Sequence, residues 1–228
     1  MQNNKKPIVI LFDVNETLLD MSPLKKKINS LLDSRRGFRI WFGLLLQYSL
    51  VDNCTKQYHD FSTIADATID MAAKALQTHI EEKEKKEALA LMKQLSAHPD
   101  VKKGLKIFKE AGYRLATLTN SPMSTLSAQL KFAGLTHFFE AALSIDAVGK
   151  YKPDPETYQY AAGALGVDLS DIVMVAAHGW DITGAIQAGM KSAFVERKGQ
   201  SLYPLAVKPD YIGKDLADIA KAIIKQSV

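Results

Sequence analysis

The chain has 228 residues, of which 47% are hydrophobic and 24% charged, and its net charge is +4. This length and composition fit an ordinary globular protein with one large domain, or with a core domain and a smaller insert. The charge is mild, and the densest lysine cluster, at residues 83–86, is mixed with glutamate as on a solvated helix face. The charge pattern therefore argues against a nucleic-acid partner.

The sequence also predicts the compartment. Cys54 is the single cysteine, so no intrachain disulfide can form, which suits a reducing environment. Residues 1–6 are polar and lack the apolar core of a signal peptide. The longest apolar run begins at Trp41 and is far shorter than the roughly 20 residues that a membrane-spanning helix needs. We therefore expect a cytoplasmic protein with no membrane partner.

Short apolar runs predict the strands of a sheet. They lie at residues 8–14, 115–119, 142–145, 172–176 and 193–195. Because these runs are apolar throughout rather than alternating, they are typical of strands buried on both faces. Residues 101–111, 124–133 and 155–165 have helical periodicity, and each stretch ends at a glycine. This alternation predicts an α/β fold with a Rossmann-like parallel sheet and helices on both faces.

Residues 20–96 break that rhythm, because they contain no convincing strand. Helical patterns cover residues 24–32, 38–50, 62–78 and 81–96. We predict an all-helical domain of residues 20–96, inserted into a core domain of residues 1–19 and 97–228.

Polar side chains gather where the predicted strands end. They are, in chain order, Asp13, Thr119, Asn120, Lys152, Tyr158, His178 and Asp181. Ligands of open parallel sheets bind outside the carboxyl ends of the strands, so these side chains are expected to converge.

The set has a coherent chemistry. A carboxylate such as Asp13 can act as a nucleophile and form a covalent ester, and a neighbouring lysine keeps it ionised. A second carboxylate or a histidine can then activate water against the ester. Each residue alone has an ordinary structural alternative: Asp13 and Asp181 as helix caps, and His178 as a structural histidine. The occurrence of all of them at four strand ends, in order, favours an active site.

These residues give the chain its resemblance to the haloacid dehalogenase-like hydrolase superfamily, over essentially the whole length. The resemblance rests on DVNET at residues 13–17, Thr119 in LTNSP, Lys152 in YKPDPETY and Asp181 in VAAHGWD. It is strongest to the type II branch, the 2-haloacid dehalogenases, whose cap domain the helical insert resembles.

The resemblance implies hydrolytic dehalogenation of a small 2-haloacid through an aspartyl ester, without a cofactor. Asp13 would be the nucleophile, Lys152 would hold it as the anion, and Asp181 would help to activate water. The remaining roles are positioning by Thr17, Thr119 and Asn120, support of Lys152 by Tyr158, and a substrate pocket that includes Asn15, Phe42, Phe61, Asn120 and Trp180. A homodimer formed through the cap is also expected from the branch.

The sequence departs from the branch at three places. Phe42 stands where those enzymes have an arginine that helps to bind halide, and Arg36 or Arg39 lies nearby as a substitute. Ala176 and His178 replace a serine and an asparagine, and His178 is suited to take a proton from water. Asn15 and Glu16 replace an aromatic residue followed by glycine.

Besides an unidentified carbon–heteroatom substrate, two other functions stay open at this point. A magnesium-dependent phosphatase or phosphonatase of the same superfamily usually has Asp-x-Asp in the first motif, and here Asn15 cannot donate a carboxyl proton. If Mg²⁺ were bound, its ligands would be Asp13, Asn15 and Asp181. A non-catalytic relative that binds a ligand is the second alternative, although it would not need the full set of reactive residues.

Overall fold

The computed structural model describes residues 9–226, and a parallel sheet with the strand order β3-β2-β1-β4-β5-β6 organises them. The strands are β1 (Val9–Phe12), β2 (Arg114–Thr119), β3 (Ala141–Ser144), β4 (Ile172–Ala176), β5 (Lys191–Val195) and β6 (Tyr211–Gly213). The five predicted strands are confirmed, except that Ile8 lies outside the described residues. The sequence did not indicate β6, since it has three residues and its central Ile212 is half exposed at the sheet edge.

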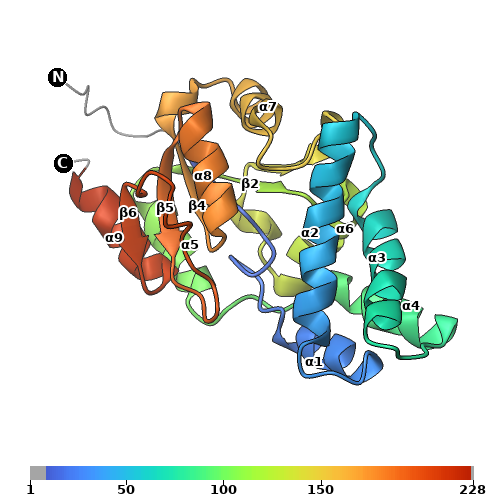
Figure 1. The fold of residues 1–228 in the computed structure, drawn as a ribbon. Coiled ribbons are helices and arrows are strands. Elements are labelled where there is room, and N and C mark those ends of the chain that lie inside the picture. Colours follow the sequence, from blue (N-terminus) through green and yellow to red (C-terminus); the bar gives the residue numbers. More distant parts are fainter. Residues whose placement is uncertain (1–8, 227–228) are drawn as a thin grey trace.

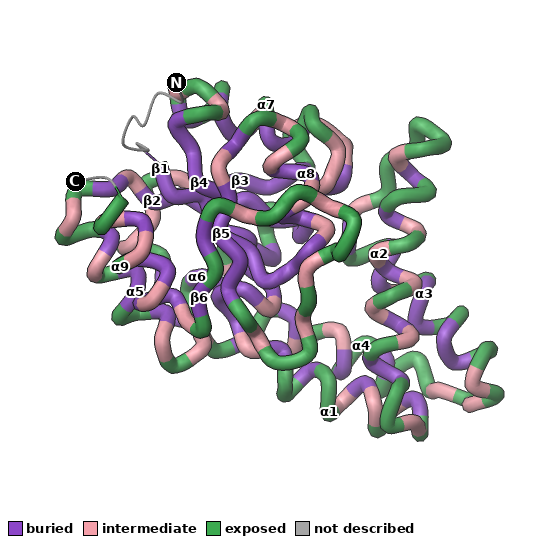
Figure 2. Tube along the Cα trace, turned by 60° about the vertical axis from the view of Figure 1, so that its left-hand side comes forward, coloured by how far each residue is buried: buried purple, intermediate pink, exposed green. Residues whose placement is uncertain are grey.

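The first apolar run forms the central strand because it can be buried on both faces. All four residues of β1 are inaccessible to solvent, and the strand pairs with β2 on one side and β4 on the other. Figure 2 shows the buried strands at the centre of the molecule. The residues that follow β1 are therefore fixed at the middle of the carboxyl edge.

Helices cover both faces of the sheet, as predicted. They are α5 (Val101–Glu110), α6 (Met123–Ala133), α7 (Pro155–Leu165), α8 (Gly179–Ala188) and α9 (Leu216–Gln226). Figure 1 shows α7 and α8 on one side of the sheet and α5 and α9 on the other. Helix α9 was not predicted, although its buried face packs against α5.

The segment between β1 and α5 is helical. It comprises α1 (Ser22–Leu31), α2 (Gly37–Thr55), α3 (Phe61–Ala75), α4 (Glu82–Ala90) and a 3₁₀ turn (Leu91–Lys93). These helices lie together beside the sheet (Figure 1). The four predicted helices are confirmed, but the last ends earlier than residue 96. Within residues 9–226, none of the helices has both the length and the apolar character required to cross a membrane.

Two contacts fix α2, the longest helix of the 20–96 segment. The buried Trp41 donates its indole N–H to the carbonyl of Ala65 at 2.9 Å, which joins α2 to α3. At the other end, the Asn53 side chain donates to the Tyr151 carbonyl at 2.8 Å and accepts from the Tyr151 N–H at 2.9 Å. Helix α2 is therefore tied directly to the loop that carries Lys152.

The packing of α5 on α9 leads to a stability prediction. A Cβ added at Gly104 would lie 2.6 Å from the Leu216 Cβ and 2.9 Å from its backbone carbon. We expect Gly104→Ala to lower the free energy of unfolding by about 1–3 kcal/mol through overpacking. Gly163→Ala in α7 is the matched control: a Cβ there meets no atom within 4 Å, so a gain of about 0.5–1 kcal/mol is expected. Urea denaturation measures both, and equal effects would contradict the packing argument.

Candidate active site

Asp13 is the first residue beyond β1 and lies at the carboxyl edge of the sheet. Its backbone N–H still donates to the Val175 carbonyl at 3.0 Å, which continues the pairing with β4. Only 4% of the residue is exposed. Because the backbone is fixed on the sheet, the carboxylate has a defined direction toward the side chains of neighbouring strand ends.

Lys152 connects Asp13 to Asp181. Its ammonium lies 3.0 Å from Asp13 Oδ1 and 2.6 Å from Asp181 Oδ2, and it donates to the Leu118 carbonyl at 2.9 Å. Burial opposes the charge, but the two carboxylates outweigh it and raise the pKa of Lys152. The lysine therefore remains a cation, and all three of its N–H groups have acceptors.

The second oxygen of Asp13 is also held. Thr17 Oγ donates to Asp13 Oδ2 at 2.6 Å and accepts from the Ala177 N–H at 2.9 Å. His178 Nδ1 lies 3.1 Å from the same oxygen. Burial would raise the pKa of Asp13, but Lys152 and His178 hold it well below its usual range. Asp13 is thus an anion with a fixed rotamer, as a nucleophile requires.

His178 is the second cation of the site. Its Nε2 lies 2.9 Å from Glu16 Oε2, so the ring bridges two carboxylates. Burial disfavours the charge, but hydrogen bonds to Asp13 and Glu16 raise the pKa of His178 to about 9. At neutral pH the imidazole is therefore protonated and cannot accept a proton from water while Asp13 is ionised. The sequence suggested that His178 is a neutral base, because it did not reveal that Glu16 places a second carboxylate on the ring.

Asp181 is fully buried and lies behind Lys152. Its Oδ1 accepts from the Tyr158 hydroxyl at 2.7 Å, and its Oδ2 accepts from Lys152. Burial raises the pKa of Asp181, Lys152 opposes the rise, and the charge of Asp13 adds to it. Tyr158 therefore supports Lys152 through Asp181 rather than by direct contact. These positions suit a role in holding the lysine.

The turn after β2 offers a hydrogen-bond donor. Asn120 Oδ1 accepts from the Lys152 backbone N–H at 3.0 Å, while its buried Nδ2 has no partner among the described residues. Thr119 Oγ accepts from the Ser121 N–H at 3.1 Å and so shapes the turn. An unpaired buried donor is costly, and a ligand acceptor would satisfy it.

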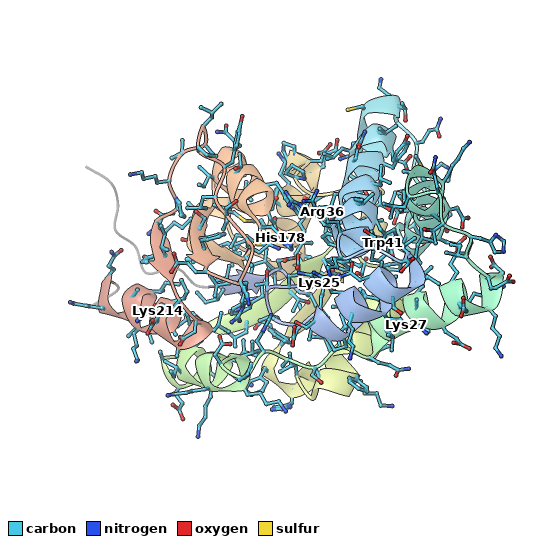
Figure 3. All side chains as sticks on the ribbon, turned by 60° about the horizontal axis from the view of Figure 1, so that its bottom comes forward. Lys25, Lys27, Arg36, Trp41, His178 and Lys214 are labelled. Carbon is cyan, nitrogen blue, oxygen red and sulfur yellow. The ribbon has the colours of Figure 1, made fainter. Side chains whose placement is uncertain are left out.

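Aromatic rings surround the polar cluster. The rings of Phe42 and Trp180 lie 6.5 Å and 5.1 Å from that of His178, both in stacked orientations. The ring centroid of Phe61 lies 5.9 Å from that of Tyr151, which is the residue before Lys152 in the sequence. Figure 3 labels His178 near the middle of the molecule and Trp41 within the helical segment.

The position of the expected arginine holds an aromatic side chain. Arg36 and Arg39 are both exposed, whereas the side chain at the arginine position is the ring of Phe42, stacked 5.4 Å from Phe38. The additional positive charge beside Asp13 is the His178 imidazolium.

Asn15, which was predicted to lie in the substrate pocket, is held by side chains of the core. Its Nδ2 donates to Ser121 Oγ at 3.1 Å, and its Oδ1 accepts from Gln129 Nε2 at 2.9 Å. The amide thus links the turn after β1 to α6 and to the turn that bears Asn120. Both of its polar groups have protein partners, and its contact with a substrate stays a prediction.

The donor set proposed for Mg²⁺ does not fit the cation. The oxygens of Asp13 and Asp181 accept hydrogen bonds from Lys152, Thr17 and Tyr158, and Asn15 Oδ1 accepts from Gln129. The ammonium of Lys152 already lies between the two carboxylates and would repel a metal ion placed there. Among residues 9–226, the side chains form no group of three or more acidic, histidine or cysteine residues able to hold a metal.

Comparison with known proteins identifies the family. The profile of the haloacid dehalogenase-like hydrolase family matches residues 9–189. The (S)-2-haloacid dehalogenase 4A of Burkholderia cepacia is 32% identical over 193 residues, which is 83% of this chain and 83% of that protein. The solved L-2-haloacid dehalogenase RSc1362 has a TM-score of 0.90 at 25% identity and covers 96% of this chain and 99% of its own. A dehalogenase solved with an intermediate complex has a TM-score of 0.87 at 28% identity, and the match covers 96% of this chain and 97% of that one.

The chain therefore belongs to the haloacid dehalogenase-like hydrolase family. The resemblance stated from the motifs is confirmed, as is the α/β fold.

The bridging position of His178 predicts a pH-dependent stability. Its pKa is raised from 6.5 to about 9 in the folded protein. Its contribution to the free energy of unfolding is therefore complete below about pH 6.5 and is lost as the pH rises through 9. His178→Asn should therefore cost roughly 2–3 kcal/mol more at about pH 6 than at about pH 10. Urea denaturation of variant and wild type at both pH values measures this difference. The control is His79→Asn, because His79 is an exposed partner of Glu81. If the cost of His178→Asn does not change with pH, His178 is not the buried cation between Asp13 and Glu16.

Proposed function

We propose that the protein hydrolyses the carbon–halogen bond of a small 2-haloacid through an ester formed on Asp13. The observation that carries the proposal is the anionic Asp13 held between two cations, Lys152 and His178. The position of the second aspartate in the Asp-x-Asp motif is Asn15, whose amide cannot protonate a leaving group. A halide ion leaves without a proton, so this arrangement suits halide better than an alkoxide.

In the first step, a carboxylate oxygen of Asp13 attacks the carbon that bears the halogen. The new carbon–oxygen bond forms as the carbon–halogen bond breaks, and the halide leaves with the electron pair. Lys152 and Thr17 hold the carboxylate in position, which lowers the entropy cost of the attack. The similarity to an (S)-2-haloacid dehalogenase and to a dehalogenase with an intermediate complex supports this chemistry.

In the second step, water attacks the carbonyl carbon of the ester. The bond between that carbon and the ester oxygen, which Asp13 had supplied in the first step, breaks. The hydroxy acid leaves with that oxygen, and the water oxygen stays in the regenerated Asp13 carboxylate. One haloacid and one water thus yield one hydroxy acid, one halide and one proton.

The substrate carboxylate requires a hydrogen-bond donor and a positive charge. The free Nδ2 of Asn120 is a suitable donor, and the His178 imidazolium supplies the positive charge that Phe42 lacks. The Phe42 and Trp180 rings limit the room beside His178, which favours a small substrate.

The domain division supports the same proposal. We infer that residues 20–96 act as a cap that brings Phe42 and Phe61 over the core of residues 1–19 and 97–228. The homodimer remains a prediction, and the exposed Leu50 and Val51 on α2 are suitable contacts for it. Light scattering of the purified protein measures the mass directly.

The metal-dependent phosphatase is the less favoured alternative, since its ligand set is engaged by protein donors. We expect release of halide from L-2-chloropropionate without added metal, and no metal-dependent release of phosphate from a chromogenic phosphate ester. Ion chromatography and a colorimetric phosphate assay, each with and without Mg²⁺, distinguish the two. Phosphate release that requires Mg²⁺ would overturn the proposal, and turnover of neither substrate would leave an unidentified substrate or the non-catalytic relative.

The nucleophile has its own test. In ¹⁸O-labelled water, repeated turnover should place ¹⁸O in the Asp13 carboxylate, because the oxygen of water enters the aspartate before the product. Asp13→Asn should reduce halide release by at least about 10⁴-fold, since an amide is a poor nucleophile. Mass spectrometry of the Asp13 peptide reads the label. An unlabelled peptide after many turnovers would indicate direct attack of water on the substrate.

A further inference from the structure

We propose that Glu16 is the positioning residue for His178, and that the two side chains together activate the water that hydrolyses the Asp13 ester. This inference rests on the proposed function, because it assigns the second half of that reaction. Neither the motifs nor the family resemblance had given Glu16 a role.

The first argument is the geometry of the ring. Glu16 Oε2 lies 2.9 Å from His178 Nε2, while Nδ1 faces Asp13 Oδ2 at 3.1 Å. A carboxylate accepts hydrogen bonds, so Glu16 fixes the proton on Nε2. When the ring is neutral, Nδ1 is then the free nitrogen, and it faces the carboxyl group that becomes the ester. A carboxylate that sets the tautomer of a catalytic histidine is a known catalytic device.

The second argument is backbone strain. Glu16 has φ = 60°, the left-handed region that side chains with a Cβ avoid. Glycine would adopt this conformation without strain, so the glutamate side chain must compensate for its cost. An observed outlier of this kind, inside a site, points to a functional side chain.

The third argument is how firmly Glu16 is held. Gln200 Nε2 donates to Glu16 Oε2 at 2.8 Å. The guanidinium of Arg197 donates to the Thr17 carbonyl at 3.0 Å and 3.2 Å, and Asp100 pairs with Arg197 at 2.7 Å. The strained turn is therefore fixed by side chains from a distant part of the chain.

Glu16 also connects the buried ring to solvent. His178 is 4% exposed, whereas the Glu16 side chain is 21% exposed and lines a cavity of about 360 Å³. The cavity lies between the turn after β1, helices α1 and α2, and residues 197–199, with Lys25 and Phe38 on its helical wall.

The proton balance follows from these contacts. In the resting site, the protonated ring lies between the carboxylates of Asp13 and Glu16. Ester formation removes the charge of Asp13, so Nδ1 loses its anionic partner and gives its proton to a water molecule that enters the site. The neutral ring, held by Glu16 at Nε2–H, takes a proton from the attacking water at Nδ1. Cleavage of the ester bond restores the Asp13 anion beside the His178 cation.

The charged groups around the ring are few. Asp13 and Glu16 face its two nitrogens, and the neighbouring rings of Phe42 on α2 and Trp180 on α8 are uncharged. Lys152 and Asp181 act on it only through Asp13, from the far side of that carboxylate. Once Asp13 is an ester, Glu16 is the one anionic partner of the ring that remains among the described residues.

The test separates the two chemical steps. A rapid-quench experiment with L-2-chloropropionate measures the halide burst, and mass spectrometry measures the decay of the ester on the Asp13 peptide. Glu16→Gln should keep the burst and slow the ester decay by about 100-fold, near the lower end of what a general base contributes. The apparent pKa of the ester decay should fall in this variant, and Glu16→Asp should recover part of the rate.

The matched control is Glu81→Gln. Glu81 makes the same kind of contact with His79, at 3.0 Å, but on an exposed surface, so both rates should stay at the wild-type values. If Glu16→Gln leaves the ester decay unchanged, or lowers the burst and the decay equally, the positioning role is refuted.

Failure of the proposed function would be visible separately, as no halide burst from the wild type. In that case, NMR of ¹³C- and ¹⁵N-labelled histidine still tests the contact without turnover. Glu16→Gln should lower the pKa of His178 and reduce the share of the Nε2–H tautomer. Unchanged titration and tautomer would refute the role of Glu16.

Discussion

The buried bridge of Lys152 between Asp13 and Asp181 is the interaction on which the rest of the site depends. Three charged groups are removed from water here, and each is stable only because the other two are in place. The bridge requires the loop after β3 to reach the ends of β1 and β4. Contacts of Asn53 with Tyr151, and of Asn120 with Lys152, hold that loop. Fold and chemistry thus share one constraint.

A second ion bridge lies on the other side of Asp13. Counted at their ordinary charges, the carboxylates of Asp13, Asp181 and Glu16 face two cations, Lys152 and His178. An ester on Asp13 would balance this count, because two carboxylates would then face two cations. The same change would release His178 from the resting state in which it cannot act as a base. The electrostatics therefore favour both formation of the ester and its hydrolysis in one site.

Much of the fold followed from local pattern. The buried strands β1 to β5 and the helices of the 20–96 segment were predictable because continuous apolar runs and helical periodicity are local signals. Strand β6 was missed because three edge residues carry little signal. Helix α9 was overlooked although its buried residues recur at helical spacing, so its pattern was a local signal too. Lys152 and Asp13 were found because their motifs lie at strand ends, where a parallel sheet brings side chains together.

The sequence by itself determined the family, the parallel sheet and the residue types that meet at its edge. Only the tertiary structure decided their ionisation and their partners. It turned Asn15 toward Ser121 and Gln129, and it placed Glu16, in a strained conformation, against His178. The physical reason is that motifs record which groups converge, whereas charge states depend on burial and on distances between residues far apart in the chain. Glu16 and His178 are 162 positions apart, so no local pattern could show their contact.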